Sequence, residues 1–450
     1  MQRIWMLVLL LALMVSMGTS AQEDDDDDKR SLSDLVLVDT VSLDDIAPDD
    51  STTPREAVIS PDGTAVALAG REGICIILID LRTGSCPEYD STGQPPDAFI
   101  LHWSPNSRYI AIEQPTLQFL RDGDIIIYDT ESNQYLNRTD DNSEANLYRD
   151  EDGPEPLVDI APIWADESGD LYFVRWQPQA DDLETLMRIP GPGGGPSIMG
   201  VGIGGGADEI LTDSEPELVT TLTGTLDRLT LYMIPPHAFD GPMAISPNGD
   251  QMALLIRPND RDSEQRGLWI LDLSSGEMSL AVPYADFVGV GVPFGMDDGP
   301  MFNLMGAEWT EDGIIVWPFD GARSFDLTTT VYKVDEETFA VTPLIDLSAF
   351  DDMNVYLERD SVNGIVKPYY ANIMPDESAI IYADNLGNCN DNPVYCGIWA
   401  LPLEADAEPI LLTTFDPQTA APFNFSLSVG MNENQIRVLL HNTIFTFEYR

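Results

Sequence analysis

Short apolar segments alternate with polar turns along most of the chain, and one unit recurs. Its core is an apolar strand, a tight Ser-Pro-Asp-Gly type of turn, a second apolar strand, a loop, and a third strand that ends in Asp. The clearest turns are Ser60-Pro61-Asp62-Gly63, Ser104-Pro105-Asn106-Ser107 and Ser246-Pro247-Asn248-Gly249. Pro presets the second turn position, Asp or Asn bonds its own backbone, and Gly accepts a conformation that other residues avoid. Each unit therefore predicts an antiparallel meander of β-strands.

Looser copies of the unit extend the pattern to the end of the chain. Further turns lie near Asp166, Thr310, Met374 and Met431, which brings the total to seven. A single meander cannot bury both of its faces, whereas meanders stacked radially bury them against their neighbours, as the blades of a β-propeller do. The repeats therefore predict an all-β fold, a β-propeller of seven four-stranded blades over residues 33–450. An eighth unit within residues 218–234 is the alternative.

The predicted last blade is one strand short, and an apolar strand near the N-terminus has no partner in its own neighbourhood. The last unit holds strands around residues 423–429, 435–440 and 443–449, while residues 35–39 read Leu-Val-Leu-Val-Asp. We expect this N-terminal strand to close the last blade, because closure removes the exposed edges of an open ring. Its alternation separates Leu35, Leu37 and Asp39 from Val36 and Val38, which predicts that both faces are mostly buried.

The repeat is similar to that of a known family. The Ser-Pro-Asp-Gly turn, the apolar strand after it and the later strand ending in Asp resemble the WD-repeat-like propeller of TolB-type proteins, over roughly residues 55–450. The resemblance implies the fold and not an activity, because propellers host many unrelated functions. TolB itself has an α/β domain before its propeller, for which residues 22–54 are too short. Propeller peptidases with a similar repeat have a hydrolase domain after it, whereas this chain ends in predicted strand.

The first residues have the features of an export signal. Arg3 supplies a positive charge, residues 4–17 an apolar stretch, and Thr19-Ser20-Ala21 a small-residue cleavage site. The apolar run is short for a membrane-spanning helix, and no later segment has the apolar length of a span. We therefore expect a signal peptide at residues 1–21, an acidic, disordered leader at residues 22–32, and a mature protein that is secreted or periplasmic and has no membrane span.

The charge balance limits the classes of molecule that the protein can bind. Lys and Arg number 22 and Asp and Glu number 77, so the formal net charge is −55. Such a polyanion repels phosphate backbones, which excludes nucleic acid as a partner. Because 43% of the residues are hydrophobic, an ordinary share for a globular protein, the acidity is expected on the surface of a folded monomer.

Cysteine usage agrees with export. Cys75 and Cys86 flank one predicted hairpin, and Cys389 and Cys396 lie in one loop. Four cysteines allow three pairings, and proximity favours two local disulfides. A simple hairpin register, however, does not place Cys75 directly across from Cys86. Zinc is not expected, because the cysteine spacing is wrong for it.

The sequence contains little sign of a cofactor-binding motif or of a catalytic nucleophile. Residues 200–205 match the dinucleotide-binding string, but without the strand before it and the helix after it they indicate a loop. A Gly-x-Ser-x-Gly motif is absent from the sequence. Calcium is the one ion that the Asp- and Asn-rich loops at residues 351–352 and 388–392 suggest, yet neither has EF-hand spacing. No resident cofactor or metal is therefore expected.

One column of positions indicates a binding site. The residue before the aromatic or aliphatic position of each predicted innermost strand is, in successive units, Val58, His102, Ile163, Ala244, Glu308 and Asn372. His102, Glu308 and Asn372 are polar members of an otherwise apolar column. Innermost strands line the central channel of a propeller, where small ligands bind. The competing interpretation is that these side chains only form hydrogen bonds between blades.

These observations favour a non-catalytic, secreted propeller that binds a protein, a peptide or a glycan through its loop face or its channel. The first alternative is a secreted hydrolase or lyase that uses carboxylates at the channel mouth, with or without calcium. A second alternative is a TolB-like component of cell-envelope assembly. A His within hydrogen-bond reach of converging carboxylates would favour the enzyme.

Overall fold

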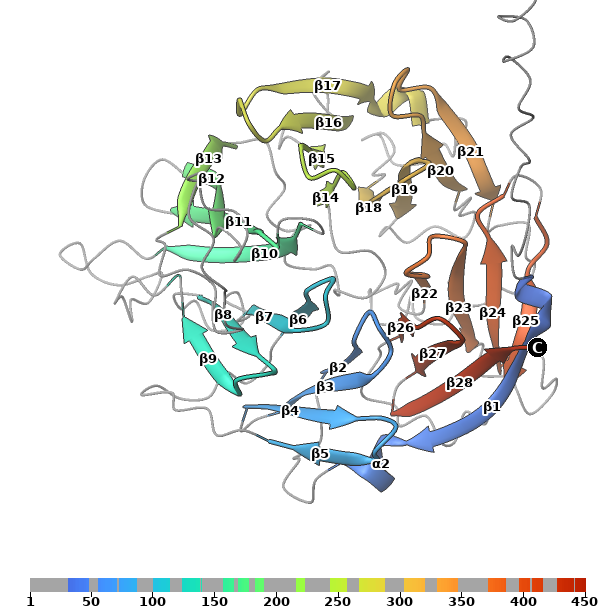
Figure 1. Ribbon diagram of the computed structural model, residues 1–450. Helices are drawn as coiled ribbons and strands as arrows, with labels where there is room; N and C mark the ends of the chain where they lie inside the picture. The colour runs from blue at the N-terminus through green and yellow to red at the C-terminus, as the bar shows by residue number, and fades with distance from the viewer. Residues whose placement is uncertain are drawn as a thin grey trace, which may run out of the picture.

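Seven sheets surround a common axis and form a ring (Figure 1). A computed structural model of the 450-residue chain describes residues 31–47, 56–70, 73–86, 100–113, 124–137, 139, 157–165, 169–177, 183–189, 216–222, 243–256, 267–287, 303–319, 330–346, 371–385, 396–404, 407–415, 427–440 and 442–450. The predicted signal peptide, the predicted leader up to residue 30, and the segments 200–205, 351–352 and 388–392, which the sequence analysis predicts to be loops, lie outside these residues.

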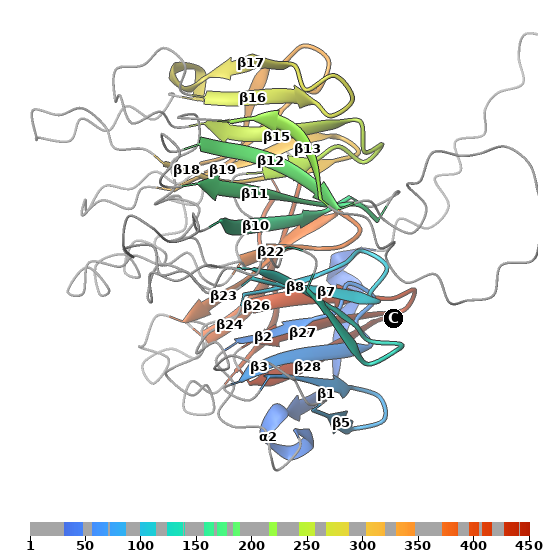
Figure 2. The ribbon, with the colours of Figure 1, turned by 90° about the vertical axis from the view of Figure 1, so that its left-hand side faces the viewer.

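Each sheet is an antiparallel blade, and the first strand named for each blade is its innermost. The first three blades consist of β2 (Glu56–Ile59), β3 (Ala65–Gly70), β4 (Gly73–Leu78) and β5 (Thr83–Ser85); β6 (Ile100–Trp103), β7 (Tyr109–Glu113), β8 (Ile125–Asp129) and β9 (Gln134–Asn137); and β10 (Val158–Trp164), β11 (Leu171–Gln177), β12 (Leu183–Ile189) and β13 (Glu217–Thr221). Seen from the side, the strands run roughly along the axis of the ring (Figure 2).

The remaining blades repeat this order. They consist of β14 (Met243–Ile245), β15 (Gln251–Ile256), β16 (Gly267–Asp272) and β17 (Met278–Pro283); β18 (Asn303–Thr310), β19 (Gly313–Phe319), β20 (Thr330–Val334) and β21 (Val341–Asp346); β22 (Ala371–Ile373), β23 (Ala379–Asn385), β24 (Cys396–Pro402) and β25 (Ile410–Thr414); and β26 (Leu427–Met431), β27 (Gln435–Leu440), β28 (Thr443–Tyr449) and β1 (Leu35–Ser42). The predicted fold, seven four-stranded blades, is confirmed. The alternative, an eighth unit within residues 218–234, is wrong for the first of these residues. They belong to β13, which pairs with β12 as the outer strand of the third blade.

The turn chemistry that the sequence predicts recurs between the first two strands of several blades. In the first blade the Ser60 hydroxyl donates to Asp62 Oδ1 at 2.6 Å, and the same oxygen accepts the backbone N–H of Thr64 at 3.0 Å. Gly63 adopts a left-handed φ of 69°. Ser104 with Asn106 and Ser246 with Asn248 repeat the hydroxyl contact at 2.7 Å. These local bonds explain why the same short motif starts successive blades.

The N-terminal strand closes the ring, as predicted. β1 pairs antiparallel with β28 from Leu35 opposite Tyr449 to Ser42 opposite Thr443, so the strand is longer than the predicted 35–39. The prediction that both faces of this strand are buried is wrong. Val38 is the extra residue of a bulge and is 50% exposed, and Asp39 is also exposed. A bulged residue on the outermost strand loses its cross-strand partner and faces the rim of the ring.

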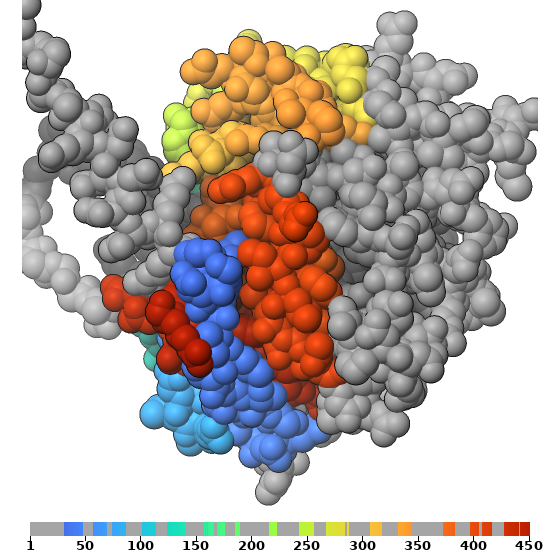
Figure 3. Space-filling view, turned by 90° about the vertical axis from the view of Figure 1, so that its right-hand side faces the viewer, coloured from blue at the N-terminus to red at the C-terminus, as the bar shows by residue number. Residues whose placement is uncertain are grey.

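The residues around β1 connect the last blade to the blades on both of its sides. Leu32 of the short 3₁₀-helix η1 (Leu32–Asp34) and Leu35 pack in the core shared by the sixth and seventh blades. At the other end, Val41 together with Leu43 and Ile46 of α2 (Leu43–Ile46) packs in the core shared by the seventh and first blades. In Figure 3, β1 is the blue band beside the orange-red sixth blade. One segment therefore contributes to the hydrophobic cores on both sides of the last blade.

Helix is scarce. Besides η1 and α2, the structure contains the 3₁₀-helix η2 (Tyr284–Phe287) in its described part. Among the residues described, none of the helices has both the length and the apolar character needed to span a membrane.

A disulfide joins Cys75 and Cys86 in the first blade. The sequence-based expectation about the hairpin register is wrong here. Leu78 pairs with Thr83 and Ile76 with Ser85, which leaves residues 79–82 as the turn and makes Cys75 and Cys86 the next opposed positions. Cys389 lies outside the described residues, so the second disulfide stays a prediction.

Candidate binding site in the central channel

A cavity of about 340 Å³ lies where the seven innermost strands meet. Every blade contributes to its wall, and the residues at the predicted column line it together with one further position, Ser428: Val58, His102, Ile163, Ala244, Glu308, Asn372 and Ser428. The fold thus brings His102, Glu308 and Asn372, which come from the second, fifth and sixth blades, to one cavity. That these three side chains bind a ligand stays a prediction.

Ser428 is the seventh member of the column and was missed in the sequence. It precedes Val429 on β26, so alignment of the last unit with the other six would have found it. Its hydroxyl oxygen accepts the backbone N–H of Ile59 at 2.9 Å, which links the last blade to the first beside the cavity. This contact supports the interblade interpretation for Ser428.

Tryptophans make the wall of the cavity continuous from blade to blade. Trp103 Nε1 donates to the carbonyl oxygen of Val58 at 3.1 Å, and Trp164 Nε1 donates to the carbonyl oxygen of His102 at 3.1 Å. Each bond joins one innermost strand to the innermost strand of the preceding blade. Trp309 instead directs its Nε1 to Glu336 Oε2 at 3.4 Å. With the indole donors engaged in this way, these residues offer mainly ring surface to the cavity.

His102 lies beside a buried carboxylate that the sequence analysis did not identify. Its Nε2 is 3.9 Å from Glu113 Oε2, and the two side chains are only 9% and 7% exposed. Glu113 ends the otherwise apolar strand β7, and this break in the apolar run was the available signal. The same Glu113 oxygen accepts the backbone N–H of Ala161 at 3.2 Å, where Ala161 has a left-handed φ of 52°. Glu113 therefore anchors the start of the third blade behind His102.

A second glutamate lies at the turn that follows β22. Glu377 lines the cavity, and its Oε2 accepts the backbone N–H of Glu311 at 2.9 Å across the boundary between the fifth and sixth blades. Pro61, Pro105 and Pro375, from the turns that follow three innermost strands, also line the cavity. Turn residues of the first, second and sixth blades thus form part of the lining.

Among the described residues, the ionisable side chains that line the cavity are two carboxylates, Glu308 and Glu377, and the imidazole of His102. Lys and Arg do not occur among the described residues that line it. Within the described part of the chain, no group of three or more His, Cys, Asp or Glu is placed to hold a metal ion.

Comparisons with known proteins find distant likenesses among solved structures and no match elsewhere. No protein-family model matches the sequence, and no curated protein matches it. Similar solved structures include oligogalacturonate lyase from Vibrio parahaemolyticus, at 10% identity and a TM-score of 0.48, which covers 92% of this chain and 96% of the lyase. Hydrazine synthase from Kuenenia stuttgartiensis is 13% identical with a TM-score of 0.46, over 89% of this chain and 98% of that one.

TolB from Acinetobacter baumannii is also similar, at 12% identity and a TM-score of 0.37, over 87% of this chain and 78% of TolB. The seven blades and their repeated turns agree with the resemblance to TolB-type propellers drawn from the sequence. At these identities the likeness concerns the fold alone.

Proposed function

We propose that this protein is an exported, non-catalytic propeller that binds part of a peptide, a protein or a glycan in its central channel. The observation that carries the proposal is the cavity to which all seven innermost strands contribute. Its volume of about 340 Å³ is at the lower end of the range for small-ligand pockets, about 300–1,000 Å³. A cavity of this size suits one side chain or one sugar unit at the end of a larger ligand.

The wall of the channel is suited to binding because it is ordered before a ligand arrives. The tryptophan bonds from Trp103 and Trp164 and the Ser428 contact tie adjacent innermost strands together. Groups held in place in the free protein cost less entropy when they meet a ligand. This rigidity supports recognition of a defined chemical group.

The carboxylate beside His102, Glu113, is engaged by the third blade, which supports a structural role for it over one in acid–base catalysis. The 3.9 Å separation between His102 Nε2 and Glu113 Oε2 exceeds hydrogen-bond distance. Glu113 is held by the backbone N–H of Ala161, which suits an anchoring role.

Export is supported by the Cys75–Cys86 disulfide, because disulfides persist in oxidising compartments. Expression of the full chain in a bacterial host, followed by fractionation and mass spectrometry, tests this part of the proposal. We expect a mature chain that begins after residue 21 outside the cytoplasm. Retention in the cytoplasm with intact residues 1–21 would contradict it.

The binding proposal is tested with peptide and glycan arrays, followed by titration of every ligand found. Asn372→Phe fills the cavity from a half-buried lining position, whereas Gln134→Phe adds the same ring to the exposed outer strand β9. We expect Asn372→Phe to abolish binding and Gln134→Phe to preserve it, with thermal melts to show that both variants fold. Ligands that bind Asn372→Phe as well as the wild type would refute a channel site.

A further inference from the structure

We propose that the chemical group taken into the channel is an organic cation, a primary ammonium or guanidinium on a short aliphatic arm. This inference rests on the proposed binding function and names its ligand chemistry. The evidence for it is the cavity itself, the carboxylates that line it and its aromatic walls.

The charge of the cavity favours a cation. Glu308 reaches it from the fifth blade and Glu377 from the turn after β22. These carboxylates belong to a chain with a formal net charge of −55. Both the local charges and the field of the whole protein attract cations and repel anions.

The walls suit the aliphatic arm that carries the cation. Trp103, Trp164 and Trp309 line the cavity, and each indole N–H already donates to another protein atom. Met243 and Met374 add flexible apolar surface. Aromatic rings attract ammonium and guanidinium groups, and apolar walls cover the methylene groups of such side chains. Glu308 is then the acceptor for the charged end.

A free amine and the Lys or Arg side chain of a peptide share this chemistry. The volume of about 340 Å³ accommodates one such group and not a chain of several. The experiment therefore tests both a free amine and a peptide side chain as ligands.

The test uses the mature protein and four probes that share a six-carbon chain: hexylammonium, hexylguanidinium, hexanol and hexanoate. Calorimetric titration should show that the two cations bind at least about tenfold more tightly than hexanoate, a difference that one charge contact can supply. A blocked Gly-Lys-Gly peptide and its norleucine counterpart form the peptide arm. Tighter binding of the lysine peptide than of hexylammonium assigns a peptide source, and the reverse assigns a free amine.

Two matched variants test whether the preference for cations comes from a carboxylate in the cavity. Glu308→Gln removes one carboxylate from the cavity, and Glu277→Gln removes one from the exposed turn between β16 and β17. We expect Glu308→Gln to weaken hexylammonium binding by about fivefold or more while hexanol binding is unchanged, and Glu277→Gln to have no such effect.

Two results would overturn the inference: hexanoate binding as tightly as hexylammonium, or a Glu308→Gln variant with unchanged cation affinity. Binding of a neutral glycan or peptide that Asn372→Phe abolishes, without any preference for cations, would refute this inference and leave the proposed function standing. Failure of every probe and of both arrays would refute the proposed function itself.

Discussion

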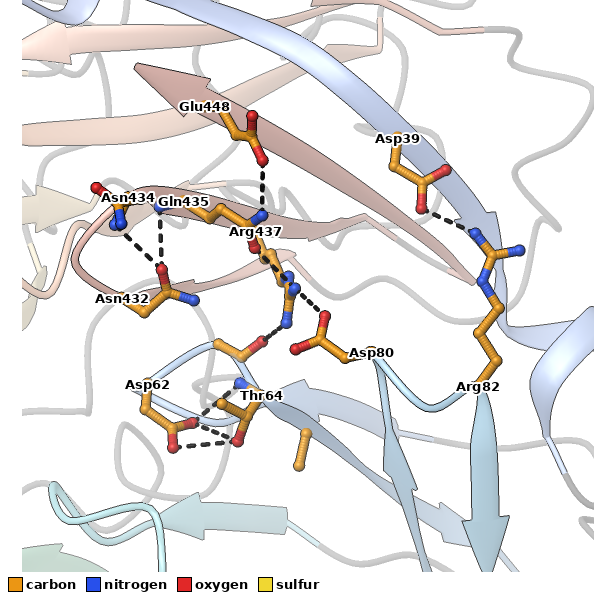
Figure 4. A network of polar contacts seen from close by, with 12 residues as sticks. Asp39, Asp62, Thr64, Asp80, Arg82, Asn432, Asn434, Gln435, Arg437 and Glu448 are labelled. Atoms are coloured by element: carbon orange, nitrogen blue, oxygen red, sulfur yellow. Dashed lines mark hydrogen bonds and ion pairs between the residues drawn. The ribbon is translucent and has the colours of Figure 1, made fainter. Parts of the chain in front are cut away.

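Arg437 on the last blade and Asp80 on the first form an ion pair across the seam at which the ring closes (Figure 4). The Arg437 side chain is 4% exposed, whereas that of Asp80 is 67% exposed. Arg437 also donates to the carbonyl oxygen of Gly63 at 2.6 Å and to Gln435 Oε1 at 2.8 Å. The buried cation is thus held by acceptors from both blades, and the seam has a polar link besides strand β1.

The two partners of this pair should differ in their contribution to stability. We expect Arg437→Met to lower the free energy of unfolding by about 1–3 kcal/mol, because the buried Gly63 carbonyl loses its charged donor. Asp80→Asn should cost no more than about 1 kcal/mol, since water replaces the contact of an exposed carboxylate. Denaturant titration measures both values. Equal losses would contradict the importance of the Gly63 contact.

Deletion of the closing segment should destabilise the ring. Removing residues 31–42 takes Leu32, Leu35 and Val41 from the hydrophobic cores on the two sides of the last blade and leaves β28 with an unpaired edge. We expect a large fall in the melting temperature. Removing only residues 22–30 should have little effect, and similar losses from both deletions would show that closure by β1 does not stabilise the fold.

A pair of substitutions within β1 separates burial from strand pairing. Leu35→Asp places a charge at a position that is 8% exposed, whereas Val38→Asp places it on the exposed bulge. We expect a loss of about 3 kcal/mol for the first and less than about 1 kcal/mol for the second. If the Val38 substitution proves equally costly in chemical denaturation, the bulge described for β1 is wrong.

Gly430 allows the last blade to approach the first. A Cβ atom at this position would lie 2.3 Å from the carbonyl oxygen of Ser60 and 2.6 Å from Gly63 Cα. We expect Gly430→Ala to destabilise the protein by about 3 kcal/mol, since backbone atoms cannot rotate away from the clash. Gly249→Ala is the control, because its Cβ meets nothing within 4 Å and only its φ of +72° is unfavourable, at about 1 kcal/mol. Thermal and denaturant unfolding compare the two.

Asp129 should make stability depend on pH. Burial alone would raise the pKa of Asp129, but hydrogen bonds from Arg108, from the backbone N–H of Glu131 and from Ser132 outweigh it and lower that pKa. A lowered pKa in the folded state stabilises the protein above the unfolded-state value, about pH 3.9, and the contribution is lost as pH falls through the folded-state pKa.

The comparison of Asp129→Asn with the wild type measures this contribution. Urea denaturation at several pH values should show a gap in stability that is constant near neutrality and closes under acid conditions. Asp312→Asn, at a side chain that is 90% exposed, should show almost no gap at any pH. A gap for Asp129→Asn that persists below the folded-state pKa would contradict the assignment.

The surplus of acidic side chains should make the protein sensitive to salt in two opposite ways. With a formal net charge of −55, self-repulsion in the folded chain weakens as ions screen it, so the melting temperature should rise from low to physiological ionic strength. Binding of hexylammonium should weaken over the same range, because screening also reduces its attraction. A melting temperature that is flat or falls would refute the first expectation.

The blade count and the column of channel residues could be predicted because they depend on short stretches of sequence. The Ser60–Gly63 turn bonds within itself, and alternation along each strand decides which side chains share a face. Once seven such units form a ring, equivalent positions meet at its axis. His102, Glu308 and Asn372 reach one cavity for this reason, although they are far apart in the sequence.

Other features depend on how particular strands meet, which local patterns do not encode. The bulge at Val38 and the opposed positions of Cys75 and Cys86 follow from strand register. The contact between Glu113 and the Ala161 N–H follows from the fit of the second blade against the third.

The sequence by itself therefore determined the propeller, its seven blades and the strand that closes it, because turn chemistry and apolar alternation act over a few residues. Only the tertiary structure decided the partners across blade boundaries, such as Arg437 with Asp80 and Ser428 with Ile59. Those contacts join residues more than 350 positions apart, and their geometry exists only after the ring has closed.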